Sequence, residues 1–250
     1  LFAAMLLSKW ILISVMVLAT FWDVYHSSLQ TFGIGRIYDL KLGNDVLKGR
    51  RLDIWLNHVF YIAPILAGVT LMDHVNDFYE FEAVGSAFFT QIPARVASHQ
   101  GVLTWLVLGL GVPFIGYYLY AYWRFAKQGY RVSFQKVALL ASTGLCSIYT
   151  WGFNSFGMAF FIMNFFHAWQ YFAIVWWMEK KNLTKTLGLQ DSQWGKPLAL
   201  LLLLAFGFGY GFWAEMTDST SGASYNLIMV IAIMHFWYYG FVWSVRKKMV

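Results

Sequence analysis

Charged residues are scarce in this chain. Asp, Glu, Lys and Arg make up 12% of its 250 residues, about half the share found in an average soluble domain. Hydrophobic residues make up 59% and aromatic residues 20%. This composition excludes an ordinary soluble domain, and it predicts an integral membrane protein built as one helical bundle.

The chain also has a single cysteine, Cys146, which lies inside an apolar run. One cysteine excludes an intrachain disulfide, and it excludes a metal site built on several thiolates. The formal net charge of +6 is the one feature that suggests nucleic acid. Because the Lys and Arg residues lie in short loops between apolar runs, the positive-inside rule accounts for them, and we expect no nucleic-acid partner.

Seven apolar runs, each bounded by charged residues, predict an all-α, polytopic bundle of seven transmembrane helices. The predicted spans cover about residues 10–35, 54–72, 102–123, 136–152, 155–178, 197–214 and 225–245. The segment 73–101 mixes apolar and polar positions and is too broken to span a bilayer, so it predicts a helix that lies in the membrane interface.

The loops between these spans alternate in charge. The second and sixth loops are acidic, whereas the first, third and fifth loops and the C-terminal tail are basic. The basic residues assigned to the first loop are Arg36, Lys41, Lys48, Arg50 and Arg51, and those assigned to the third loop are Arg124, Lys127, Arg131 and Lys136. This alternation predicts an outside N-terminus, a cytoplasmic C-terminus and a place in a bacterial inner membrane.

Polar residues interrupt the most apolar stretch of the chain. The segment 153–181 is long enough to cross a bilayer, yet it contains Asn164, His167 and Gln170 near its centre. Polar side chains inside a membrane are costly, usually face the protein interior and mark a functional site.

Three histidines lie at matching depths in different predicted spans. Counted from the charged residue that ends each span, His26, His167 and His235 lie 10–12 residues in, which is roughly 15–18 Å at the helical rise. His58 lies 7 residues from such an end. A single intramembrane histidine is often just hydrogen-bonded to a neighbouring helix. Several at one depth favour a shared site, and neutral imidazoles are common ligands of iron, copper and zinc.

Polar neighbours accompany the histidines. Asp23, His26 and Gln30 share one helical face, and Asp23 is expected to orient a ligand imidazole through its second nitrogen. The alternative for Asp23 is a protonated carboxyl that is hydrogen-bonded to another helix. Asn164 and Gln170 accompany His167, and Tyr239 lies one turn from His235.

Aromatic side chains crowd around His167 in the sequence. We expect Phe161, Phe165, Phe166 and Tyr171 to line a pocket for a lipophilic substrate, although such residues more often serve packing alone. Tryptophans near the span ends are typical of interface anchors.

The segments NFFHAWQYFAIVW and MHFWYYGFVWSVRKK resemble, at a distance, the bacterial membrane carotene-cleaving dioxygenases of the Brp/Blh type. The resemblance covers about 30 residues. It implies that His167 and His235 bind iron, and that His26 and His58 complete a four-histidine site by topology. The chain departs from the family at two positions: Tyr171 stands in place of a second histidine, and Tyr239 in place of an acidic residue.

The sequence leaves several functions open. The leading hypothesis is a membrane-embedded, metal-dependent oxidoreductase, with non-haem iron and a lipophilic or lipid substrate. The alternatives are a haem-, quinone- or pigment-binding subunit, or a purely structural subunit, of a larger membrane complex. A transporter that relays protons through buried Asp and His is a further class. A retinal-binding rhodopsin is excluded, because the predicted span 225–245 has no lysine for a Schiff base.

Overall fold

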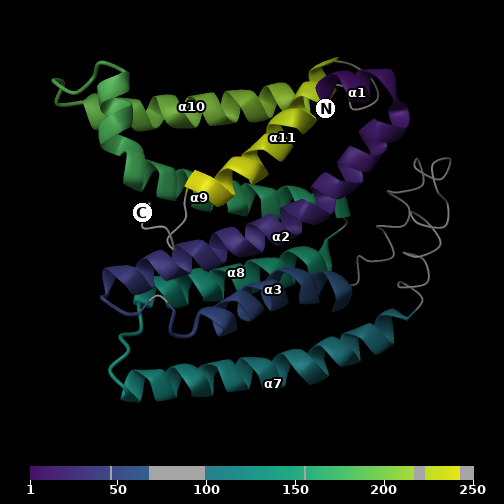
Figure 1. Ribbon diagram of the computed structural model, residues 1–250, viewed down its shortest axis with the longest axis vertical. Helices are drawn as coiled ribbons and strands as arrows, with labels where there is room; N and C mark the ends of the chain where they lie inside the picture. The colour runs from purple at the N-terminus through teal and green to yellow at the C-terminus, as the bar shows by residue number, and fades with distance from the viewer. Residues whose placement is uncertain (46, 68–98, 155, 217–222, 243–250) are drawn as a thin grey trace. The chain divides into compact units, whose positions relative to one another are not determined.

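The chain folds into helices throughout the part that the structure describes. The computed structural model describes residues 1–250 except 46, 68–98, 155, 217–222 and 243–250. The helices of Figure 1 are α1 Phe2–Leu7, α2 Lys9–Lys41, α3 Arg50–Ala67, α7 Gln100–Lys127, α8 Phe134–Phe153, α9 Phe156–Thr186, α10 Gly195–Glu215 and α11 Ala223–Val242. The all-α prediction is therefore confirmed for these residues.

Each of the seven predicted spans overlaps one of these helices. Among the described residues, three stretches are long and apolar enough to cross a membrane, namely Gly101–Lys127, Met158–Thr186 and Gly195–Ala214. The first predicted span stops at residue 35, whereas α2 continues to Lys41. The interfacial helix expected in 73–101 and the last part of the span 54–72 lie outside the described residues.

The chain divides into two compact units. The first contains Leu1–Met16 and Phe165–His235, and the second contains Val17–Asn164 and Phe236–Val250. In the first unit α10 approaches α9 closely at Gly207. A Cβ atom at that position would lie 2.3 Å from the Cζ atom of the Phe172 ring, so glycine permits this contact.

In the second unit α3 packs against both α7 and α8. Leu56, Tyr118 and Leu140 belong to one buried cluster there, and Tyr61 and Trp151 belong to another. The backbone of Arg131 and the side chain of Asn44 exchange two hydrogen bonds, of 2.8 and 2.9 Å, which join the α2–α3 loop to the α7–α8 loop. Gly129, with a φ of 90°, ends α7 in the left-handed region that favours glycine.

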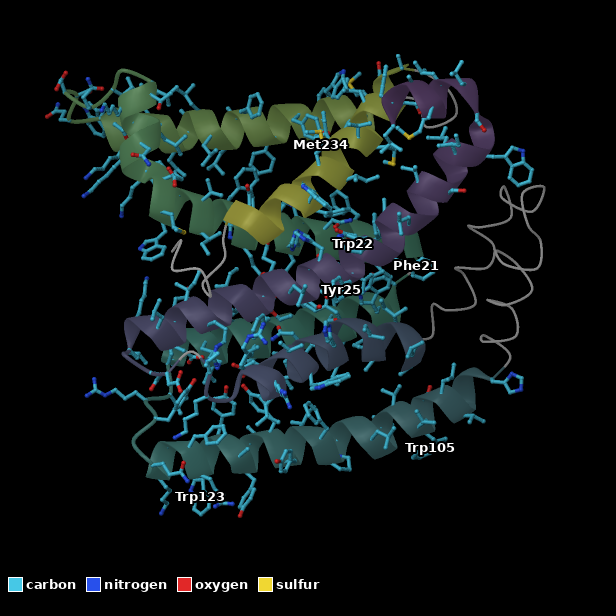
Figure 2. The ribbon with its side chains drawn as sticks, viewed as in Figure 1. Phe21, Trp22, Tyr25, Trp105, Trp123 and Met234 are labelled. Carbon is cyan, nitrogen blue, oxygen red and sulfur yellow. The ribbon has the colours of Figure 1, made fainter. Side chains whose placement is uncertain are left out.

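The second unit is apolar outside and holds many polar groups inside, beside its apolar clusters. On α7 the side chains of Trp105 and Trp123 project outward and are 77% and 56% exposed (Figure 2). The inner positions of α2 and α8 include several polar side chains. The residues 4% exposed or less include His26, Ser27, Ser28, Gln30 and Thr31 on α2, and Thr143, Ser147 and Thr150 on α8. Apolar outer surfaces with buried polar groups are what a bilayer selects for.

Candidate functional site

Two of the predicted histidines face one another in the first unit. His167 on α9 and His235 on α11 have ring centroids 6.3 Å apart, with the ring planes at 84°. His167 is buried, and the ring of Tyr171 lies edge-on to His235 at 5.2 Å. Tyr171 follows His167 by four residues, so both side chains project from the same face of α9. The structure thus brings His167, His235 and Tyr171 together within this unit, and their roles as ligands and substrate contact stay predictions.

Among the described histidines, His26 is buried like His167, and it belongs to the second unit. His26 on α2 is buried, and its ring packs at 4.9 Å on Phe236, the residue that follows His235 in α11. Asp23 lies almost one turn before His26, and its carboxyl is hydrogen-bonded to Asn164 in α9. Because the observed partner of Asp23 is an amide, its expected role in orienting an imidazole stays a prediction.

His58 has a different environment in the second unit. Its Nδ1 atom lies 2.9 Å from the Ser28 hydroxyl, and its ring stacks on Tyr25 at 5.6 Å. The half-buried imidazole also meets the exposed ring of Trp55 edge-on. With one ring nitrogen engaged by Ser28, His58 retains a single nitrogen for any ligand, and its metal-binding role stays a prediction.

The other predicted residues differ in burial. Gln30 is fully buried, whereas Gln170 and Phe166 are half-buried. Phe161 and Phe165 are 63% and 50% exposed, so these two rings lie on the outer side of α9, away from its buried His167 face. The side chain of Tyr239 lies outside the described residues.

A second polar site lies in the second unit, and we call it the charge cluster. It consists of Arg36 and Asp39 on α2, Asp53 on α3 and Lys136 on α8, each 3% exposed or less. Arg36 Nη1 lies 2.7 Å from Oδ2 of each aspartate. Lys136 Nζ lies 2.8 Å from Asp39 Oδ2 and 2.7 Å from Asp53 Oδ2. Two cations thus alternate with two carboxylates, and the cluster has no net charge.

Two tyrosine hydroxyls complete the hydrogen bonding of the Asp53 carboxylate. Tyr118 and Tyr122, one turn apart on α7, donate to Asp53 Oδ1 at 2.8 and 2.5 Å. Lys136 in turn donates to the Tyr122 oxygen at 2.9 Å. The Asp53 carboxylate therefore accepts from Arg36, Lys136 and both tyrosines, which is how a buried anion keeps its charge at an acceptable cost.

The charge cluster also makes contacts with the α2–α3 and α7–α8 loops. Arg36 Nη2 donates to the backbone carbonyls of Asp45 and Lys48 at 3.3 and 3.0 Å, which holds the α2–α3 loop. Burial, together with the neighbouring Asp39 carboxylate, raises the pKa of Tyr130 in the α7–α8 loop. That phenol therefore stays neutral near pH 7 and receives a weak contact from Lys136 at 3.4 Å.

The charge cluster was not predicted from the sequence. The prediction that Arg36 and Lys136 are loop charges is wrong, because both side chains lie in helices and are buried against aspartates. Two signals pointed to the cluster: aspartates inside a segment otherwise rich in cations, and tyrosines spaced four apart on α7. The depth of His26 was counted from Arg36, which lies inside the protein, five residues before α2 ends.

No family model, curated protein or solved structure matches the chain.

Proposed function

We propose that the chain is a polytopic protein of a bacterial inner membrane with seven spans, an outside N-terminus and a cytoplasmic C-terminus. The overlap of all seven apolar runs with helices supports the number of spans. The exposed cations near the α2–α3 and α7–α8 loops support a cytoplasmic position for these loops. Cysteine accessibility tests the topology, with a cysteine at Lys127 labelled only from the cytoplasmic side.

We further propose that the protein is a metal-dependent oxidoreductase, with non-haem iron, acting on a lipophilic substrate. The observation that carries the proposal is the imidazole pair of His167, which is buried, and His235, which is half-buried, with ring centroids 6.3 Å apart. The third ligand that we propose is His26, because the sequence puts it at a depth that matches those of His167 and His235.

The donor set fits iron. Neutral imidazoles suit Fe, Cu and Zn, and no thiolate competes for the ion, since Cys146 is the chain's one cysteine. Iron held by a few histidines keeps coordination positions open for dioxygen, and this is the chemistry that the metal supplies. His58 is a candidate fourth ligand by the family resemblance alone.

The residues around the histidines take supporting roles in this proposal. Asp23, hydrogen-bonded to Asn164 and three residues before His26 in the sequence, would partly balance the charge of a bound cation. Gln30, Gln170 and Tyr239 supply further polar groups. Tyr171, in contact with His235, is the aromatic residue best placed to meet an apolar substrate.

One observation favours haem as the alternative. Two histidines whose rings face each other, as those of His167 and His235 do, are also residues that would hold a haem. A haem-, quinone- or pigment-binding subunit of a membrane complex is therefore the second candidate.

Metal content and the visible spectrum of the purified protein test the proposal. We expect about one iron per chain without a Soret band, and we expect that His167→Ala and His235→Ala each lose the metal. The matched control is His99→Ala, an exposed histidine just before α7, which should keep it. A Soret band supports haem instead, and a metal-free protein that is fully folded overturns both proposals.

A further inference from the structure

The charge cluster determines which cations stay exposed at the end of the second unit that we propose is cytoplasmic. Both aspartates of the cluster are buried and paired with Arg36 and Lys136. The cations left outside the cluster form a group that we call the basic rim: Lys41, Lys48, Arg50, Arg51, Arg124, Lys127 and Arg131. Among the described residues of the two loops and the adjoining helix ends, one carboxylate is exposed beside them, Asp45.

The basic rim is held together by contacts between the two loops. Asn44 binds the backbone of Arg131, and Lys48 Nζ donates to the Gln128 side chain at 3.2 Å. The charge cluster fixes the same loop from inside through Arg36. The seven cations therefore sit on a braced surface rather than on separate flexible loops, and their charges act on the same partner.

Aromatic rings lie directly under several of these cations. Lys127 lies over Trp123 at 5.0 Å, Lys48 over Phe125 at 5.2 Å and Arg50 over Phe32 at 5.6 Å. Exposed aromatic rings next to cations are typical of the membrane–water boundary, where rings meet acyl chains and cations meet headgroups. This pairing favours a lipid over a soluble anion as the partner.

We propose that the basic rim binds anionic phospholipid headgroups of the membrane surface. Clusters of four to eight Lys or Arg residues just outside a membrane helix attract anionic lipids, at about fivefold in affinity for each cation. The rim lies apart from the proposed metal ligands in the sequence and uses none of them. It is therefore a separate binding surface, and the oxidoreductase proposal can fail without affecting it.

The test compares phosphatidylglycerol with phosphatidylcholine as bound lipids, titrated onto the delipidated full-length protein in neutral detergent and followed by native mass spectrometry. The variant is Arg51→Gln/Arg124→Gln/Arg131→Gln, because these exposed side chains take no part in the charge cluster. The matched control keeps the charge, with Arg51→Lys/Arg124→Lys/Arg131→Lys. Thermal melting verifies that both variants fold, and metal content verifies that the histidine site is unchanged.

We expect the native protein and the lysine variant to prefer phosphatidylglycerol, and the glutamine variant to lose about a hundredfold of that preference. The preference should also weaken as salt is raised, because exposed charges are screened. Equal binding of the two lipids by the native protein would overturn the proposal. An unchanged preference in the folded glutamine variant would do the same.

Discussion

Removing one cation from the charge cluster should expose how strongly the second unit depends on it. Lys136 Nζ lies within 2.8 Å of both Asp39 and Asp53 and is 3% exposed. Lys136→Met keeps most of the side-chain length but leaves one buried negative charge without its cation. Breaking a buried ion pair in this way costs about 3–5 kcal/mol. For a chain of this size, that corresponds to a melting temperature lower by about 6–20 °C.

The assay is thermal melting in mild detergent, with chemical unfolding in a denaturing detergent as a second measurement. Lys127→Met is the control, since its side chain is exposed and such substitutions cost about 0.5 kcal/mol or less. The double variant Lys136→Met/Asp39→Leu removes one charge of each sign and leaves Arg36 with Asp53. It should be more stable than the sum of the two single changes predicts, by about 1–3 kcal/mol. A loss below about 1 kcal/mol for Lys136→Met would contradict the reasoning.

Three other changes have definite expected outcomes. Tyr122→Phe removes hydroxyl contacts to Asp53 and Lys136 and should cost about 1–3 kcal/mol, whereas the exposed Tyr120→Phe should melt like the native protein. Gly49→Ala places a Cβ atom 2.6 Å from the Tyr122 hydroxyl at a φ of 74°. It should destabilise more than Gly129→Ala, which has positive φ but open space, and equal losses would show that only backbone strain matters. Asp23→Asn should leave the fold intact but weaken metal binding about 10–100-fold under chelator competition, and an unchanged metal content would rule out its proposed supporting role.

The helical class was determined by the sequence alone, and so was the position of nearly every helix. Long apolar runs between charges leave little choice, because only a helix satisfies every backbone group within its own segment in a bilayer. The sequence also contained the information that His167 and Tyr171 lie on one helix face and that this face and His235 turn towards the protein interior. Spacing puts Tyr171 on the His167 face, and polar residues in an apolar helix turn towards the protein interior.

The tertiary structure alone decided which charges are exposed. Arg36 and Asp39 on α2, Asp53 on α3 and Lys136 on α8 come from three helices, and each cation lies within 2.8 Å of both carboxylates. Charge counting along the sequence treats each of these residues as solvated, because it has no information on partners. Burial of an ion requires an opposite charge and hydrogen bonds at fixed positions, and those positions exist only once α2, α3, α7 and α8 have packed together.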